Sequence, residues 1–88
     1  MHAVIVEVTI NDIEQAQSEL RERVVPAVSQ APRFVAGYWM DRGEGKGHSV
    51  VVFENEEAAN RAAEQVRSNA PSQVTVDSVS VHEVVAHA

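Results

Sequence analysis

Hydrophobic and polar residues follow two different periods along this chain of 88 residues. Segments rich in β-branched residues, with the two-residue period of strands, occur four times: residues 3–10, 33–41, 48–54 and 73–85. Between them, apolar residues recur every three or four positions, as in amphipathic helices, from Asn11 or Asp12 to Ala31 and from Asn55 to Asn69. The order β-α-β-β-α-β predicts an α+β, ferredoxin-like fold, in which two helices cover one face of a four-stranded antiparallel sheet.

Local signals refine these elements. Pro26 lies inside the first helical pattern and predicts a kink or break near residues 23–25. Asn55 is a suitable cap for the second helix, which we expect to end at residues 69–71. The apolar parity of the last strand changes near residues 77–78, which predicts a β-bulge there.

Both faces of the predicted sheet carry apolar side chains. We expect the second and third strands to pair with Asp41 opposite His48. One face then holds Phe34, Ala36, Tyr38, Met40, Val51 and Phe53, and the other holds Val35, Gly37, Trp39, Val50 and Val52. Two helices cover only one face, so an apolar face is left over. The sequence therefore predicts a homodimer in which two open sheet faces meet.

The chain resembles the dimeric α+β barrel superfamily, and within it the antibiotic biosynthesis monooxygenase-like group. The resemblance covers nearly the whole chain. It lies in Val25-Pro26, in residues 31–38 (APRFVAGY), which are similar to the group's Pro-Gly-Phe approach to strand two, and in residues 51–59 (VVFENEEAA). Arg33 stands where the group has glycine. The resemblance implies a homodimer with facing sheets, a long last strand that reaches the partner, and a pocket between sheet and helices.

The resemblance also implies a candidate activity. Some members of the group oxygenate aromatic polyketides without metal or flavin, and relatives degrade haem. Those enzymes have an asparagine on strand one, a tryptophan in helix two and, in haem degraders, a histidine beyond it. This chain has Glu7 on strand one, and its second helix has no aromatic residue, with Arg61 and Ala62 near the equivalent position. Whether the protein is an enzyme stays open here, and we expect no cofactor.

Three of the four glycines lie within residues 43–47, GEGKG. A phosphate-binding P-loop has Ser or Thr after its lysine and then a helix, whereas Lys46 precedes Gly47 and a strand. RNA-recognition motifs share the predicted element order, but their third strand carries aromatic residues where His48 and Val50 stand. We therefore expect a flexible hairpin turn, with an RNA-binding or regulatory module as the least favoured function.

Composition narrows the classes of partner. The net charge of −6 disfavours binding to nucleic acid or to an anionic membrane surface. No apolar run reaches the roughly 20 residues of a membrane helix, and no signal-peptide pattern is present, so we expect a single cytoplasmic domain over residues 1–88. There is no cysteine for a disulfide or a thiolate site. His2 and His82 lie on neighbouring strands without a further ligand at suitable spacing, so we expect no metal site.

Candidate site residues lie on the second and third strands. An aspartate opposite a histidine favours the charged imidazole, which makes Asp41 and His48 the candidate catalytic pair. Trp39, Tyr38 and Phe34 are candidate ligand contacts because they offer flat apolar surfaces. We favour the simpler interpretation that Trp39 belongs to the core or the dimer interface. The main hypothesis is a homodimer that binds a small apolar or aromatic molecule, and the alternative is a cofactor-independent monooxygenase-like enzyme.

Overall fold

The elements follow the predicted order. The computed structural model describes residues 1–69 and 73–88. Its elements are β1 (His2–Ile10), α1 (Ile13–Glu19), η1 (Leu20–Val24), α2 (Val25–Ser29), β2 (Phe34–Gly43), β3 (Lys46–Phe53), α3 (Glu56–Ser68) and β4 (Val74–Glu83). The segment η1 is π-helical, so α1, η1 and α2 together form the first helix. The second helix ends at Ser68 with Asn69 as its C-cap, in agreement with the predicted end at residues 69–71, of which Ala70 and Pro71 lie outside the described residues.

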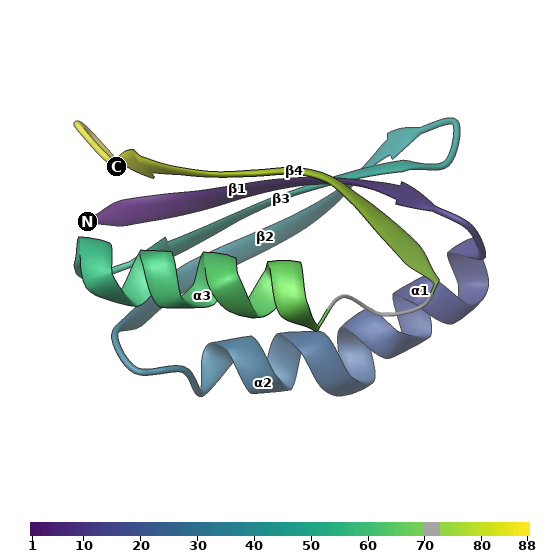
Figure 1. Cartoon of the computed structure of the whole chain (residues 1–88), viewed down its shortest axis with the longest axis horizontal. Coiled ribbons are helices and arrows are strands. Elements are labelled where there is room, and N and C mark those ends of the chain that lie inside the picture. The colour runs from purple at the N-terminus through teal and green to yellow at the C-terminus, as the bar shows by residue number, and fades with distance from the viewer. Residues whose placement is uncertain (70–72) are drawn as a thin grey trace.

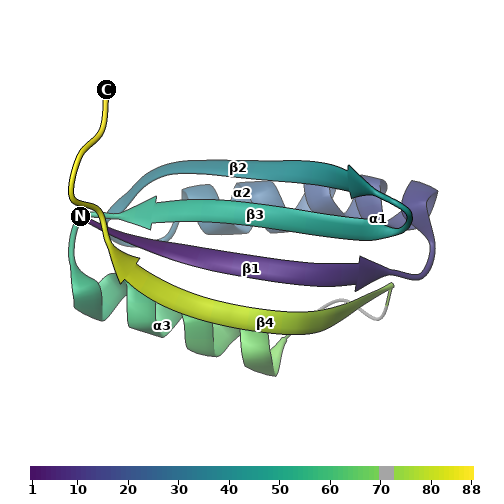
Figure 2. The same cartoon turned by 90° about the horizontal axis from the view of Figure 1, so that it is seen from above.

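The four strands form one antiparallel sheet in the order β2-β3-β1-β4. Figure 1 shows both helices on the same side of this sheet. In Figure 2 the sheet is seen from its open side, with α3 behind β4 and the first helix behind β2 and β3. The predicted α+β, ferredoxin-like fold is therefore confirmed.

Side-chain caps begin both helices. The Oδ1 atom of Asp12 accepts a hydrogen bond from the backbone N–H of Gln15 at 3.1 Å. The Oδ1 atom of Asn55 accepts one from Ala58 at 2.9 Å. Each cap satisfies a donor that the first helical turn leaves without a partner. The prediction at Asn55 is confirmed, and Asp12 is the cap of the two candidates at the first helix.

The irregular part of the first helix precedes Pro26, as the sequence predicted. Pro26 has no N–H and its ring would clash with the carbonyl of Glu22, so a regular α-helical turn is not available there. The backbone N–H of Val25 bonds instead to the carbonyl of Leu20, five residues earlier, which is the wider turn of a π-helix. The helix continues beyond the proline and ends at Ser29.

The glycine-rich segment forms a tight hairpin turn. β2 and β3 run further than predicted, so only Glu44 and Gly45 separate them. Both residues have positive φ, 56° and 74°, and Gly43 before them has φ 84°. Glycine adopts these angles without the steric cost that other residues have, which explains why glycines gather here. The prediction of a hairpin turn is confirmed.

The predicted register between β2 and β3 is wrong. Gly43 pairs with Lys46 at the turn, but a bulge at Arg42 then adds one residue to β2. Asp41 consequently lies opposite Gly47, and His48 lies opposite Met40. Because side chains alternate between faces, this shift of one residue changes which β2 and β3 side chains share a face.

The core lies between the sheet and α3. Its buried members are Val4, Val6, Val51, Phe53, Ala59 and Ala63. The predicted bulge in β4 is confirmed, because Glu7 pairs with Ser78 and the next residue, Val8, pairs with Val76. Asp77 is the extra residue, and it allows valines on both sides of it to face the helices.

Over the described ranges, no helix is both long enough and apolar enough to cross a membrane.

Candidate functional site

A cavity of about 980 Å³ separates the first helix from the sheet. Its walls come from β1, β2, β3, β4, the first helix and α3. The apolar side chains along these walls include Val4, Val6, Val8, Leu20, Val24, Val28, Trp39, Val51, Phe53, Ala58, Ala62 and Val66. This is the location, between sheet and helices, that the family resemblance implied.

The cavity exists because the first helix does not pack closely on the sheet. None of the residues of α1, η1 or α2 is buried, and Ile13 keeps 45% of its surface exposed. The π-helical turn supplies part of the wall through Leu20 and Val24. Such irregular turns are frequent at functional sites because they change the direction of the side chains.

Trp39 forms a flat part of the cavity wall. It lies on the helix-facing side of β2, opposite Ser49 on β3, which is itself only 8% exposed. Its indole ring lies over Gly37: a Cβ atom on that glycine would approach Trp39 Cη2 to 2.7 Å and Cζ3 to 2.8 Å. The absence of a side chain at Gly37 therefore allows the indole to lie against its own strand.

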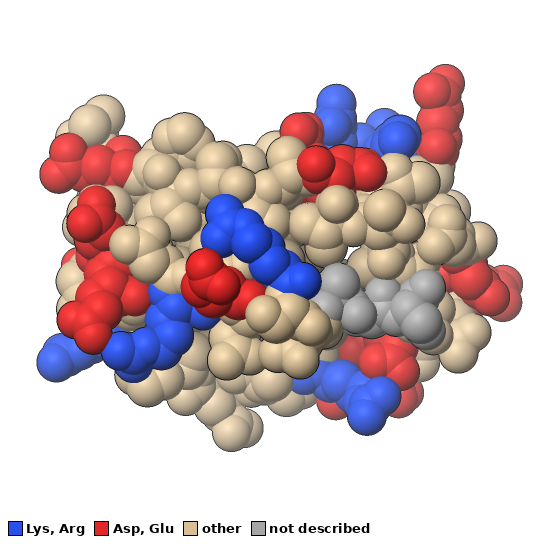
Figure 3. Space-filling model, in the orientation of Figure 1, with Lys and Arg blue, Asp and Glu red and all other residues tan. Residues whose placement is uncertain are grey.

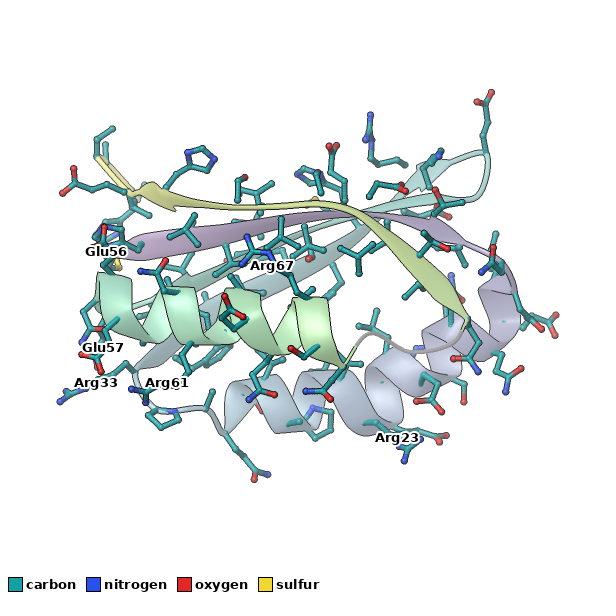
Figure 4. All side chains as sticks on the ribbon, in the orientation of Figure 1. Arg23, Arg33, Glu56, Glu57, Arg61 and Arg67 are labelled. Atoms are coloured by element: carbon teal, nitrogen blue, oxygen red, sulfur yellow. The ribbon has the colours of Figure 1, made fainter. Side chains whose placement is uncertain are left out.

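The charged residues that line the cavity are mostly basic. Three arginines, Arg21, Arg23 and Arg61, oppose Glu19 and Asp41. Arg23 pairs with Glu19 at 3.2 Å, and Arg61 pairs with Glu57 on α3 at 2.8 Å. In Figure 4, Arg61 extends from α3 and Arg23 from the first helix, well apart from each other. Among residues 1–69 and 73–88, Arg21 is the lining arginine without an ion pair, and its charge favours a negatively charged group in the ligand.

The structure does not bring the three candidate ligand contacts together. Trp39 lines the cavity. Phe34 packs edge-on against Phe53, with ring centroids 6.2 Å apart, within the apolar core. Tyr38 is 62% exposed and lies opposite Val50 on the face away from the helices.

Asp41 and His48 are also separated. The carboxylate of Asp41 accepts a hydrogen bond from the backbone N–H of Gly43 at 2.7 Å, within the bulge of β2. His48 borders the cavity, but its Nδ1 atom lies 3.5 Å from Glu7 Oε1 on the opposite face of the sheet. The carboxylate nearest to His48 is therefore Glu7, its cross-strand neighbour on β1.

Glu7 is the centre of a group of polar residues on the open face of the sheet. Arg42 Nη1 donates to Glu7 Oε1 at 2.6 Å, and Ser78 Oγ donates to Glu7 Oε2 at 3.3 Å. Beside them, Thr9 Oγ1 donates to Asp77 Oδ2 at 2.7 Å and accepts from Lys46 Nζ at 2.8 Å. We call this group the open-face polar cluster: Glu7, Thr9, Arg42, Lys46, His48, Asp77 and Ser78.

Sequence reasoning missed the arginines of the cavity. Neither Arg21 nor Arg61 was a candidate ligand contact, yet Arg21 directly follows Leu20 and Arg61 directly precedes Ala62, two positions of the apolar stripes. That adjacency was the available signal. For metals, the described residues contain no group of three or more histidines and carboxylates able to hold an ion.

Comparisons with known proteins agree with this geometry. No family model matches the chain, and no curated protein sequence matches it. Several solved structures match, and three of them match over 100% of this chain. HapK from Hahella chejuensis has 13% identity, a TM-score of 0.70 and 96% of its own length covered. A variant of MhuD with two manganese protoporphyrin IX molecules bound per active site has 23% identity, a TM-score of 0.65 and 98% covered. The heme-degrading protein Rv3592 from Mycobacterium tuberculosis has 26% identity, a TM-score of 0.54 and 99% covered.

These three proteins have the antibiotic biosynthesis monooxygenase-like fold of the dimeric α+β barrel superfamily. The present chain shares that fold, with the same four-stranded antiparallel sheet and two helices. The predicted resemblance is confirmed.

Proposed function

We propose that this protein binds a flat, mainly apolar molecule with a negatively charged group, in the cavity between the first helix and the sheet. The observation that carries the proposal is the cavity itself, with about 980 Å³ of space and apolar walls on both sides. Ligand pockets in proteins commonly have volumes of about 300–1,000 Å³ and apolar linings with a few polar groups. The cavity has both properties.

The shape and charge of the ligand follow from the walls. The indole of Trp39 lies flat along β2, so it presents a face on which a planar molecule can stack. Arg21 lies at the same space without an ion pair in the described part of the chain, while Arg23 and Arg61 are paired with Glu19 and Glu57. A guanidinium group binds carboxylate with paired hydrogen bonds. A planar carboxylic acid therefore fits the lining better than a neutral chain.

Tetrapyrroles are one such class, and the names of two similar structures refer to them. The apolar walls fit the macrocycle, and the arginines fit its carboxylates. The lining does not fit the metal, because the histidine that borders the cavity, His48, turns its Nδ1 toward Glu7. We therefore propose binding of the organic molecule without a metal. Asp41 and His48 do not form the pair that the monooxygenase-like alternative used as its catalytic group.

Titration with two planar anions tests this proposal. Trp39 is the only tryptophan and lines the cavity, so its fluorescence reports on occupancy. We expect saturable quenching by metal-free protoporphyrin IX, and an increase in the emission of 1-anilinonaphthalene-8-sulfonate on binding.

Two variants of α3 provide a matched comparison. Ala62→Phe places a ring in the cavity and should weaken binding of both probes at least about tenfold, or about 1.4 kcal/mol. Asn60→Phe adds the same ring at an exposed position of the same helix and should leave binding unchanged. Equal affinity in both variants would show that the probes bind elsewhere.

We also propose that two copies of the chain pair through their open sheet faces. Ile5, Val50 and Val52 are only half-buried there, and Tyr38 and Met40 expose 62% and 45% of their surfaces. A second copy would cover these residues. Sedimentation analysis at micromolar concentration should give a dimer for the natural chain and a monomer for Val50→Lys. A folded monomer of the natural chain would refute the pairing.

A further inference from the structure

A second, smaller recess adjoins the cavity at the end where the first helix leads into β2. Its volume is about 210 Å³, and its lining consists of Pro32, Arg33, Asn55, Glu57, Ala58 and Arg61. Three of these residues, Pro32, Ala58 and Arg61, also line the cavity, so the two spaces share a wall. Four of the six lining residues are polar or charged, whereas the walls of the cavity are mainly apolar. A ligand in the cavity therefore has a polar space beside it.

Two arginines from different parts of the chain face this recess. Arg33 lies in the connection between the first helix and β2, and Arg61 lies in the second turn of α3. Figure 4 shows both side chains with Glu57 at the same end of the molecule, whereas Arg23 lies toward the opposite end. Figure 3 shows basic and acidic side chains together at that end, on the left of the view. The recess is therefore separate from the arginines of the first helix.

Carboxylates of the same chain occupy these arginines only loosely. Arg61 Nη2 donates to Glu57 Oε1 at 2.8 Å. Arg33 Nη1 lies 3.7 Å from Glu54 Oε2, which is too long for a hydrogen bond. The side chains of Glu57 and Glu54 are 81% and 57% exposed, so each can turn into water at little cost. An acidic group of a ligand can therefore take their place.

The backbone fixes Arg33 beside α3. Its φ is 67°, in the left-handed region that favours glycine. Its carbonyl accepts a hydrogen bond from the N–H of Glu54 at 2.8 Å, and the N–H of Phe34 donates to the carbonyl of Ala31 at 3.2 Å. These bonds join the connection to the residue that follows β3. The backbone that carries Arg33 is therefore held next to the start of the helix that carries Arg61.

We propose that the recess binds an acidic group that the ligand carries on a flexible arm, while its planar body lies in the cavity beside Trp39. The inference rests on the ligand binding proposed above and adds the class of ligand: a flat apolar body with a carboxylate at the end of a short chain. The arm passes the shared wall at Pro32 and Ala58, and its carboxylate replaces Glu57 at Arg61. A carboxylate attached directly to the ring stays with the ring in the cavity.

Three pyrene derivatives with the same planar body test this inference. 1-Pyrenebutyric acid has its acid at the end of a short chain, 1-pyrenebutanol has a neutral hydroxyl there, and 1-pyrenecarboxylic acid has its acid on the ring. Titration followed by pyrene emission gives the three affinities. We expect the natural chain to bind 1-pyrenebutyric acid at least about fivefold more tightly than 1-pyrenebutanol, since the arm reaches two arginines that contribute up to about 1 kcal/mol each.

Arg33→Gly removes one of the two cations from the recess. The affinity for 1-pyrenebutyric acid should fall about two- to fivefold, as for a partly exposed charge pair. Affinity for the other two probes should stay the same, because their polar groups do not enter the recess. Glycine readily adopts the backbone angle of residue 33, so the variant should fold as well as the natural chain. Arg61→Gln should weaken binding of 1-pyrenebutyric acid by a similar factor.

Glu57→Gln should have the opposite effect. The substitution frees Arg61 from the carboxylate of its own helix, so affinity for 1-pyrenebutyric acid should rise about twofold. A pair that only supports the fold would give no such gain. Glu64→Gln makes the same change of charge on α3 at a carboxylate that pairs with Arg67 outside the recess, and it should leave the affinity unchanged.

The outcomes distinguish this inference from the proposed function. If Ala62→Phe does not weaken binding of any pyrene probe, the probes bind outside the cavity and both proposals fail. If the probes bind in the cavity but Arg33→Gly has no effect, or weakens all three equally, the recess does not bind the acid and the inference alone fails. Arg33→Asn removes the same charge with a residue that also tolerates the left-handed conformation, and it should reproduce the selective loss should glycine loosen the connection.

Discussion

The two helices of this protein meet the same sheet in different ways. α3 lies close to the sheet, and Ala59 and Ala63 on its inner side are 0% and 1% exposed. The first helix has no buried residue and is separated from the sheet by the cavity. Small side chains on one helix bring it near, and an irregular turn on the other keeps it away. We therefore expect the half with α3 to provide most of the stability and the half with the first helix to provide the proposed binding space.

Enlarging an alanine on each helix is the strongest test of this division. Ala59→Leu adds atoms where no space remains, so we expect the free energy of unfolding to fall by about 3 kcal/mol. Ala16→Leu makes the same change on the first helix, beside the cavity, and should alter stability by less than about 0.5 kcal/mol. Urea unfolding followed by circular dichroism measures both. Similar losses in the two variants would mean that the first helix is packed as closely as α3.

The packing of Trp39 against Gly37 offers a second test, which concerns only the half of the protein that holds the cavity. Gly37→Ala would place a methyl group 2.7 Å from the indole, so the ring must move toward the cavity. We expect affinity for protoporphyrin IX to fall about tenfold, equivalent to about 1.4 kcal/mol. In a Trp39→Leu background the added methyl group meets no indole, so Gly37→Ala should cause no further loss beyond that of Trp39→Leu alone, measured by the absorbance change of the porphyrin. A further loss in that background would mean that the glycine matters for the strand and not for the cavity.

The contrast between local and long-range features explains what the sequence could predict. The cap at Asn55, the irregular turn before Pro26 and the bulge at Asp77 each depend on a few neighbouring residues, and all three were predicted. The bulge at Arg42 was not predicted: the side chain of the extra residue bonds to Glu7, which is 35 positions away in sequence, and the local contribution of Asp41 and Gly43 was not recognised. Because this bulge was not predicted, the predicted register paired His48 with Asp41 instead of Met40.

The family resemblance implied a pocket between sheet and helices, but the residue pattern could not predict the size of the cavity, for a related reason. Its volume depends on the distance between the first helix and the sheet, which no single segment determines. The apolar stripe of the first helix was recognised, but an amphipathic stripe predicts only which side faces the sheet. The positions of α3, Trp39 and the irregular turn decide whether Leu20 and Val24 contact the valines of the sheet or line a cavity.

Replacing Pro26 tests whether the π-helical turn η1 depends on this proline and whether the turn affects ligand binding. Pro26→Ala supplies the missing N–H and removes the clash with residue 22, so we expect η1 to become α-helical. Stability should rise by about 1 kcal/mol, because a proline inside a helix costs up to about 3 kcal/mol. Ligand affinity should fall a few-fold as Leu20 and Val24 rotate on the cavity wall. Far-UV circular dichroism and porphyrin titration measure the two effects. Pro32→Ala, outside the helix, should leave the helical signal unchanged. Unchanged porphyrin binding in Pro26→Ala would mean that the π-helical turn does not contribute to ligand binding in the cavity.

The smallest expected effect concerns the charge of the cavity. Arg21 lies in η1, lines the cavity and has no ion pair among residues 1–69 and 73–88, so it is available to a ligand carboxylate. Arg21→Gln should lower the affinity for protoporphyrin IX about two- to fivefold, since an exposed charge pair contributes about 0.2–1 kcal/mol. Raising the salt concentration should weaken binding to the natural chain more than to the variant, because screening acts on the missing pair. Arg67→Gln removes a charge from α3 outside the cavity and should change neither affinity nor salt dependence. An equal effect of the two substitutions would mean that the net charge of the protein, and not the lining of the cavity, attracts the anion.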